Sequence, residues 1–564
     1  MFIDARSISA GETIDTEVAV IGSGAAGISL ARDLARHGIG VTIVESGDRQ
    51  LTSETQRLYA GSNVGLPYFP LDAARLRYFG GTTNHWSGTC RPLEPFDLQE
   101  HAWIPNSGWP IGIADLEPFS AEAAELCGLK SNEWSPRHWV AESPYPALSL
   151  GSGVVTRVAQ NVRSVNRRFA DRFADDLHDA EARILLNANV IEIMVADPRD
   201  QVGALRVATL EGTEFTVSAR SYVLAAGGIE NARLLLVSRG RHPEGVGNEH
   251  GLVGRYFLEH PRFIAGLLVP FRPDIDLRFY NGHDAGGSRI TGYLSLRPEV
   301  RAQEQIVDVQ LRLEPMYPDF FVRAQDSPDV VALRALLGRT EREPDWAVDL
   351  ARVADDVTSW RRVLALGGPL PLPRPDAVAQ FMGLTAAERE ALMPEVLGDI
   401  ATLAYGETIG TIPTEAIALT ARIDPVPNPA SRVRLGADTD ALGMPRVELD
   451  WQLTELDRRS VERTIELVGR AVGEAGIGRV RLTLDGDVGT WPADLAGGWH
   501  HMGTTRMHDD PRRGVVDGDG RVHGMRNLYV SGSSVFATGG SGTPTMTLVA
   551  LALRLASHLR GDTT

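Results

Sequence analysis

The sequence predicts an α/β protein, α+β overall, in which a domain of antiparallel strands and helices is inserted into a domain built on a parallel sheet. Three observations predict it. Near the N-terminus a buried strand, a glycine-rich turn, a helix and a second strand follow one another within residues 17–45. In the middle of the chain, segments such as 306–311 alternate apolar and polar residues, as antiparallel strands do. From about residue 491 glycine-rich turns return, followed by a strand at 528–530 and a helix.

The N-terminal unit has the spacing of a Rossmann-like nucleotide-binding turn. Gly22 permits the tight turn, Gly24 lets the backbone approach a pyrophosphate, and Gly27 lets the helix pack closely on the strand. Gly38 is expected to end that helix. Glu45 ends the second strand, where its carboxylate can accept hydrogen bonds from ribose hydroxyls. The unit predicts a bound dinucleotide, either FAD or NAD, against the alternative of a glycine turn in an empty α/β domain.

Further glycine-rich segments have small residues where packing alone does not need them. They lie at 79–88, 225–233, 497–507, 527–536 and 539–545. Such loops suit a flat ring laid against the backbone, and tight structural loops are the alternative. In the last segment Thr543 and Pro544 form a good N-cap and first-turn pair for the terminal helix. That helix N-terminus would stabilise negative charge on a reduced ring, whereas the plain interpretation of Thr543 is a cap only.

The domain limits follow the change in sequence texture. Residues 1–263 and 486–564 are expected to form the nucleotide-binding domain, with 51–150 supplying loops over the ring. Residues 264–485 are expected to form the substrate-binding domain. Within it, helices are expected near 346–366 and 386–405, with a proline-rich loop at 368–376 between them.

Composition excludes several classes of function. The 564 residues carry a formal net charge of −17, which disfavours nucleic acid as a partner. Two cysteines are too few for a disulfide framework or a four-thiolate metal site, so no metal is expected and a reducing cytoplasm is the default. Neither a secretory signal nor an apolar run of membrane-spanning length is found in the sequence. The oligomeric state is not indicated.

Together these motifs resemble the glucose–methanol–choline (GMC) oxidoreductases. The resemblance runs along nearly the whole chain in the family's order, and it is nearest to the bacterial and pyranose-oxidase-like sugar oxidoreductases. Beyond the N-terminal turn, the segments that carry it are 80–88, 107–110, 225–236, 253–256, 259–261, 431–433 and 500–564.

The resemblance implies a Rossmann-like FAD-binding domain with a GMC-like substrate domain, and oxidation of a CH–OH group. It implies that His500 is the base that takes the alcohol proton while the hydride goes to flavin N5, with His501 as the rival and a packed core histidine as the plain alternative. The family's second catalytic position, usually His or Asn, falls on Thr543, which can donate a hydrogen bond but is no base at neutral pH. The residues expected at FAD are Gly22, Gly24, Ala25, Ala26, Gly27, Glu45, Ser46, Gly80, Gly81, Thr82, Asn84, His85, Trp86, Ser87, Val190, Ala226, Gly227, Asn231, Ser533, Thr543, Pro544 and Thr545.

Several alternatives stay open at this point. In pyranose oxidases a histidine in a similar context is joined covalently to the flavin, so His85 is either such an anchor or a residue packed beside a dissociable flavin. The expected substrate is a small alcohol or carbohydrate, such as a sugar, polyol, amino sugar or glycoside, and the electron acceptor is oxygen or another molecule. The other functions considered are an FAD-containing lyase, an NAD-dependent dehydrogenase and, least favoured, a non-catalytic binding module.

Overall fold

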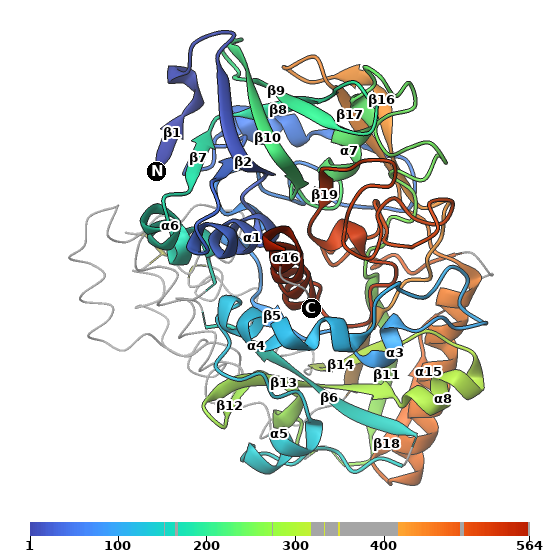
Figure 1. Ribbon diagram of the computed structural model, residues 1–564. Coiled ribbons are helices and arrows are strands. Elements are labelled where there is room, and N and C mark those ends of the chain that lie inside the picture. Colours follow the sequence, from blue (N-terminus) through green and yellow to red (C-terminus); the bar gives the residue numbers. More distant parts are fainter. Residues whose placement is uncertain are drawn as a thin grey trace.

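The computed structural model describes residues 1–151, 153–163, 167–272, 275–316, 332, 348–349, 416–484 and 490–561. Two large sheets and one small sheet organise these residues. Figure 1 shows the first sheet in the upper half of the view and the second in the lower half, with the C-terminal helix between them. The helices expected near 346–366 and 386–405, and the loop at 368–376, lie outside the described residues except for 348–349.

The first sheet is the parallel sheet of the nucleotide domain, extended on one side by two antiparallel strands. In spatial order its strands are β1 (Phe2–Asp4), β7 (Arg183–Leu186), β3 (Val41–Val44), β2 (Thr13–Ile21), β10 (Glu214–Leu224), β9 (Val202–Ala208) and β8 (Asn189–Val195). A further strand, β19 (Leu528–Val530), pairs in parallel with the C-terminal end of β10. The C-terminal segment of the chain therefore returns to the first sheet, as the sequence predicts.

The N-terminal unit forms as expected. Between β2 and β3 lies helix α1 (Ala25–Arg36), and Gly38 follows with a positive φ of 78°. The close approach at the turn explains one of the glycines, because a Cβ on Gly27 would lie 2.0 Å from the carbonyl oxygen of Gly22. Gly22 itself has a φ of 100°, which side-chain-bearing residues rarely adopt.

The second sheet is antiparallel, as the alternation at 306–311 predicts. Its strands, in spatial order, are β18 (Gly478–Leu482), β11 (Arg262–Pro270), β15 (Ala416–Ile423), β14 (Val309–Met316), β13 (Ser288–Leu296), β6 (Val154–Asn161) and β5 (Thr89–Cys90), and β12 (His283–Ala285) pairs with β13. A small third sheet contains β16 (Arg432–Thr439), β17 (Pro445–Asp450) and β4 (Gly61–Asn63).

The sheets do not follow the expected domain limits at every point. Strands β5 and β6 precede residue 263, within the segment expected to belong to the nucleotide domain, yet both pair in the second sheet. Strand β4 comes from the same segment and pairs with β17 in the third sheet. These pairings join residues far apart along the chain, which local sequence texture does not record.

Helices cover both large sheets. The described α-helices are α1, α2 (Ser53–Gln56), α3 (Pro95–Leu98), α4 (Glu117–Leu126), α5 (Pro136–Glu142), α6 (Phe169–Asp179), α7 (Glu230–Val237), α8 (Pro298–Glu304), α15 (Glu455–Glu474) and α16 (Thr545–Arg560). Helix α16 packs between α1 and α4, and its central position is visible in Figure 1. Within the described residues no helix is both long enough and apolar enough to cross a bilayer.

The start of α16 differs from expectation. The residue at its N-cap is Pro544, and no side chain caps the helix. Thr543 instead donates a hydrogen bond from its hydroxyl to the carbonyl oxygen of Thr89, 2.7 Å away. The interpretation of Thr543 as the N-cap is therefore wrong, because its side chain is used to attach the loop before α16 to strand β5.

A buried carboxylate connects the second sheet to the C-terminal segment. Asp308, just before β14, is almost fully buried and accepts hydrogen bonds from Arg157 of β6 (2.5 Å), Ser295 of β13 (2.6 Å) and Ser541 (2.5 Å). Burial opposes its charge, but Arg157 and Arg301 outweigh burial and hold the pKa of Asp308 far below its usual range. This carboxylate stays ionised and fixes the loop of Ser541 on the sheet.

Replacing Asp308 by Ala should destabilise the protein by about 3–5 kcal/mol, because Arg157 and Arg301 would lose a buried counter-charge. Urea unfolding of both proteins measures the difference. Asp284→Ala on β12 is the control, since its side chain is 51% exposed and its loss should change stability by less than about 0.5 kcal/mol. Equal midpoints for the Asp308 variant and the wild type would contradict the role assigned to this carboxylate.

Candidate active site

One large cavity of about 870 Å³ brings the glycine-rich segments together. This is within the size range of ligand and cofactor sites. The expected residues that line it are Gly22, Gly24, Ala25, Ala26, Glu45, Ser46, Gly81, Thr82, His85, Trp86, Ser87, Val190, Ala226, Gly227, His500, Ser533, Thr543, Pro544 and Thr545. Segments separated by several hundred positions in the sequence thus form one wall.

Glu45 holds the glycine turn in place. Its Oε2 accepts hydrogen bonds from the Ser23 amide (3.0 Å) and hydroxyl (2.5 Å), and its Oε1 accepts from the Gly47 amide (2.8 Å). The Ser23 hydroxyl in turn accepts from the amide of Gly80 at 3.1 Å. The carboxylate expected at a ribose therefore also connects the first and second glycine-rich segments.

Four expected residues lie behind the wall of the cavity. Gly27 packs α1 on the turn, and Gly80 lies at the start of the second glycine loop with a φ of 93°. Asn84 donates to the Phe79 carbonyl at 2.8 Å, while Asn231 accepts from the Ala226 amide at 2.9 Å and donates to Ser534 at 2.9 Å. The side chains of Asn84 and Asn231 shape the loops, because their polar atoms form hydrogen bonds within the protein.

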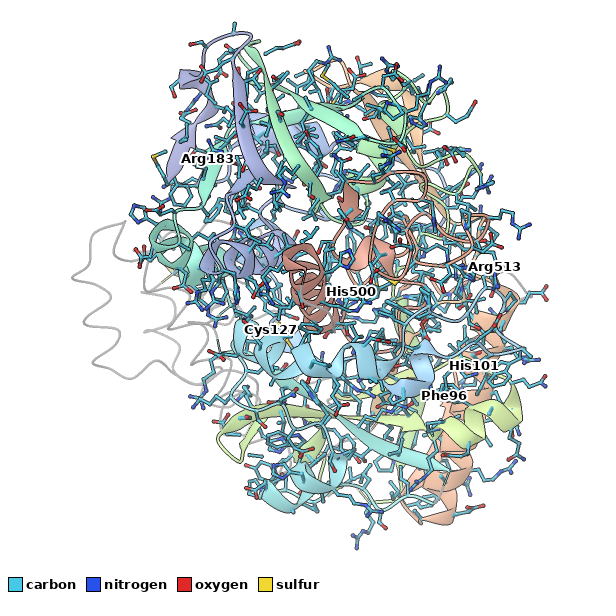
Figure 2. The ribbon with its side chains drawn as sticks, in the orientation of Figure 1. Phe96, His101, Cys127, Arg183, His500 and Arg513 are labelled. Atoms are coloured by element: carbon cyan, nitrogen blue, oxygen red, sulfur yellow. The ribbon has the colours of Figure 1, made fainter. Side chains whose placement is uncertain are left out.

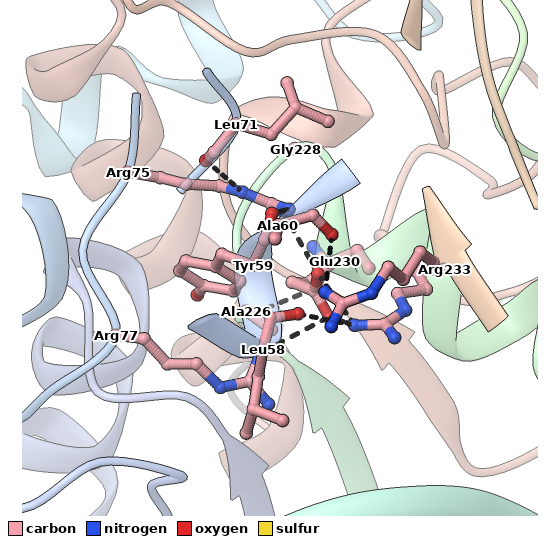
Figure 3. A network of polar contacts seen from close by, with 12 residues as sticks. Leu58, Tyr59, Ala60, Leu71, Arg75, Arg77, Ala226, Gly228, Glu230 and Arg233 are labelled. Carbon is pink, nitrogen blue, oxygen red and sulfur yellow. Dashed lines mark hydrogen bonds and ion pairs between the residues drawn. The ribbon is translucent and has the colours of Figure 1, made fainter. Parts of the chain in front are cut away.

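A buried arginine cluster, which the sequence did not lead us to expect, contributes Arg75, Arg77 and Glu230 to the wall of the cavity. Figure 3 shows the contacts within this cluster. Arg75 and Arg77 line the cavity and pair with Glu230 at 3.1 Å and 3.6 Å. Arg75 also lies over the ring of Tyr59, 4.0 Å from its centroid. Burial raises the pKa of Glu230, but the positive charges of Arg233, Arg75 and Arg77 outweigh burial, so its pKa lies below the usual value. Two arginines so close to Gly80 are the sequence signal that could have indicated this cluster.

His500 lies in the middle of the molecule between the two large sheets (Figure 2) and faces the cavity. Its Nδ1 lies 2.7 Å from Nδ1 of His260, whose Nε2 lies 2.6 Å from the carbonyl oxygen of Gly540. Burial lowers the pKa of His260 to about 3, helped by the charge of Arg422. His260 is therefore neutral at physiological pH.

These contacts fix which nitrogen of His500 carries a proton. A carbonyl oxygen only accepts, so neutral His260 donates from Nε2 to Gly540 and its Nδ1 has a lone pair. His500 must then donate from Nδ1 to His260, and Nε2 of His500 is left as the unprotonated nitrogen. Burial, His260 and Arg422 hold the pKa of His500 well below its usual value. A neutral imidazole with a free lone pair can accept a proton.

The backbone around His500 is held by Glu259. Its carboxylate accepts from the amides of Gly498 (3.0 Å) and His500 (3.0 Å) and from the hydroxyl of Tyr68. Burial raises the pKa of Glu259 to about 7. His501, the rival base, lies 2.8 Å from the same Tyr68 hydroxyl through its Nε2, so this nitrogen is already engaged within the protein.

Thr543 and His85 line the same cavity as His500. Because the Thr543 hydroxyl donates to Thr89, it presents lone pairs rather than a proton to a ligand. Nε2 of His85 lies 3.1 Å from the hydroxyl of Tyr78, and burial with the nearby Arg168 lowers the pKa of His85. The His85 ring is therefore neutral where it meets the cavity.

Family models match most of the described chain. A model described as "FAD dependent oxidoreductase" matches residues 17–327, and one described as "GMC oxidoreductase" matches residues 427–552. The first covers more than half of the 564 residues and includes the glycine turn and the arginine cluster. The second includes His500 and the loop before α16.

Similar proteins span the same length. Paromamine 6'-oxidase of Streptomyces fradiae is 26% identical over 97% of this chain and 91% of that protein. The fructose dehydrogenase large subunit of Gluconobacter japonicus is 22% identical over 98% and 99%. Among solved structures, pyridoxine 4-oxidase from Mesorbium loti aligns with a TM-score of 0.52 at 17% identity, over 97% of this chain and 100% of that one. A fungal aryl-alcohol oxidase aligns with a TM-score of 0.53 at 14% identity, over 97% and 99%, so both share the fold.

Substitutions at two glycines of the N-terminal turn distinguish a residue needed for ligand contact from one needed for folding. A Cβ on Gly24 would meet nothing within 4 Å in the protein, whereas one on Gly27 would meet the Gly22 carbonyl at 2.0 Å. Gly24→Ala should therefore leave the melting temperature of protein made under riboflavin limitation close to that of wild type, yet lower the flavin-to-protein ratio of protein made in rich medium. Gly27→Ala should lower both the melting temperature and the flavin content.

The measurements are thermal unfolding and the visible absorbance per mole of protein. Full flavin content in the Gly24 variant would contradict the placement of a dinucleotide at this turn.

Proposed function

Because this chain belongs to the GMC family of FAD-dependent oxidoreductases, we propose that it oxidises a CH–OH group of a small sugar, polyol, amino sugar or glycoside. The observation that carries the proposal is the placement of a neutral His500, with one unprotonated nitrogen, in the wall of the cavity lined by the glycine turn. The similar proteins include enzymes named as oxidases and as dehydrogenases, so the acceptor is oxygen or another molecule.

The residues present fit FAD. The glycine turn before α1 brings the backbone of Gly24 to the cavity, where a Cβ on this residue would meet no protein atom within 4 Å, and Glu45 follows β3 beside it. At the other end, Thr545 begins α16 and faces the cavity, so the positive end of that helix is directed at the site. When bound, FAD supplies a two-electron acceptor for the hydride that leaves the carbinol carbon.

His500 removes the other product of the oxidation. The alcohol O–H proton passes to Nε2 of His500 while the carbinol C–H bond breaks, and the substrate becomes a carbonyl compound. Nδ1 of His500 stays bonded to His260, which keeps the ring oriented and in the required tautomer. His260 acts as a positioning residue in this proposal.

At the position that the family resemblance makes the second catalytic one, Thr543 has a hydrogen-bond partner within the protein. Thr543 was expected to donate a hydrogen bond to the substrate oxygen, but its proton is given to Thr89. We therefore assign the proton transfer to His500 alone. Thr543 and the neighbouring α16 N-terminus, which line the cavity, supply the remaining polarity at this side of the site.

His85 has two possible roles that acid precipitation separates. If the yellow colour stays in the pellet and is lost to the supernatant in His85→Ala, His85 is the covalent anchor of the flavin. If wild-type protein releases the colour, the flavin is held by the glycine turn, Glu45 and packing. An FAD-containing lyase is the alternative function, and it predicts that no alcohol bleaches the flavin anaerobically.

Replacing His500 by Ala should keep the visible spectrum but slow anaerobic flavin reduction by an alcohol roughly 10²–10⁴-fold, the usual contribution of a general base. Stopped-flow absorbance measures the reduction. His501→Phe is the matched control and should retain most of the rate. Loss of reduction in the His501 variant with a fast His500 variant would transfer the role to His501.

In the pH profile of the flavin reduction rate, the fall on the acid side should occur below the ordinary pKa of histidine. Because the pKa of His500 is lowered, the base is already unprotonated at pH 6.5, so the reduction rate should stay level from pH 8 to below pH 6. His260→Phe removes the acceptor for Nδ1–H, so the His500 ring loses the hydrogen bond that orients it and fixes its tautomer. In that variant the reduction rate should fall at least about tenfold. An unchanged rate in the variant would reduce His260 to a packing role.

A further inference from the structure

Arginines gather at the end of the cavity that lies on the second sheet. Arg262 of β11, Arg312 of β14 and Arg422 of β15 all line the cavity, together with Gln310 of β14. Three adjacent strands of the sheet therefore present positive charge to the same space. The chain as a whole has a net charge of −17, so this end of the cavity is opposite in sign to the protein.

Strand register places like charges opposite each other. Arg262 of β11 pairs with Arg422 of β15, and Arg422 pairs with Gln310 of β14, so these residues form one row across three strands. Like charges directly opposite in a sheet are destabilising. Burial lowers the pKa of Arg422, and the neighbouring Arg91, Arg312 and Arg262 lower it further, although Tyr293 acts in the other direction. Such an arrangement costs stability unless something balances the charge.

The described protein supplies little to balance it. No described carboxylate lies within 4.0 Å of the guanidinium of Arg262 or Arg422, and Arg312 pairs with Glu314 at 3.3 Å. Arg422 donates from Nε (3.2 Å) and Nη2 (2.5 Å) to Oε1 of Gln310. Nε2 of Gln310 is buried and has no partner among the described residues. Donors are therefore in excess at this point, and acceptors are lacking.

The arginine row lies close to the proposed base. The charge of Arg422 contributes to lowering the pKa of both His500 and His260. Among the described residues, the carboxylates that line the cavity are Glu45 and Glu230. Glu45 is engaged with Ser23 and Gly47, and Glu230 with the buried arginine cluster. The space next to His500 is thus bordered by cations and a free amide donor.

We propose that the alcohol substrate carries an anionic group of oxygen atoms, a carboxylate or a phosphate ester, which Arg422, Arg262 and the Gln310 amide bind while its carbinol carbon lies at His500. This inference rests on the proposed alcohol oxidation and names its substrate class. Guanidinium groups match both anions geometrically through paired N–H donors. Within the proposed range of substrates, sugar acids, hydroxy acids and sugar phosphates are favoured, and cationic amino sugars are disfavoured because bringing an ammonium group here adds repulsion.

Binding of simple anions tests the site apart from catalysis. Acetate and inorganic phosphate are titrated into the holoprotein by calorimetry, for wild type, Arg422→Gln and the control Arg481→Gln. Arg481 lies on β18 of the same sheet, is exposed and does not line the cavity. One of the two anions should bind to wild type and to the control, and Arg422→Gln should weaken binding about 10–100-fold. The preferred anion identifies the carboxylate or the phosphate arm. Binding of neither anion, or equal binding by the Arg422 variant, would overturn the proposal.

Substrate selectivity tests it in the reaction. Anaerobic flavin reduction is compared for D-glucose, D-glucuronate, D-glucose 6-phosphate, D-glucosamine, glycerol, glycerate and glycerol 3-phosphate. For each matched set, the ratio of the limiting reduction rate to the half-saturating substrate concentration should be at least tenfold higher for an anionic member than for its neutral partner. Most of this difference should come from a lower half-saturating concentration, and Arg422→Gln should abolish it. If the Arg422 variant does not fold, Arg262→Gln, at a more exposed position, takes its place and should reduce the difference between the anionic and neutral substrates. A preference for neutral or cationic members would contradict the inference while leaving the alcohol oxidation intact. If no alcohol reduced the flavin although anion binding was retained, the proposed function would be contradicted instead.

Discussion

The pairing between residues 258–262 and 496–502 holds the candidate site together. Leu258 and Met502 exchange both backbone hydrogen bonds at 3.0 Å, and Arg262 and Ala496 do the same at 2.8 Å and 2.9 Å. Between them, the Glu259 carboxylate accepts a hydrogen bond from the backbone amide of His500, and the His260 ring accepts one from the His500 side chain. Because residue 262 begins β11, the loop of the proposed base is attached directly to the second sheet.

The polar face of that sheet is turned toward the cavity. Asp308 and Gln310 alternate with apolar residues, and in a sheet with one solvated face both would be exposed. Instead both are buried, Asp308 with Arg157 and Ser541 and Gln310 with Arg422. The alternation identifies the strands correctly, but the medium on the polar side is a ligand cavity and a charged cluster rather than water.

Overall charge is a poor guide to the charge at the site. The acidic composition of the chain disfavours a polyanionic partner, whereas the arginine row places positive charge beside His500. Surface carboxylates dominate the net charge, but solvent and salt screen them over about 10 Å. A few cations on a low-dielectric wall therefore determine the local field, and only strand register brings Arg262, Arg312 and Arg422 together.

By itself the sequence determined the local features: the N-terminal unit, the glycine segments and β19 follow from periodicity and from backbone conformations that need glycine. The tertiary structure decided the rest. It placed β5 and β6 in the second sheet, used the Thr543 hydroxyl on Thr89 instead of on α16, and set Arg262 opposite Arg422 with Arg312 on the next strand. The reason is physical: spacing along the chain records which face a residue occupies, but hydrogen-bond partners and opposing charges come from segments hundreds of residues away.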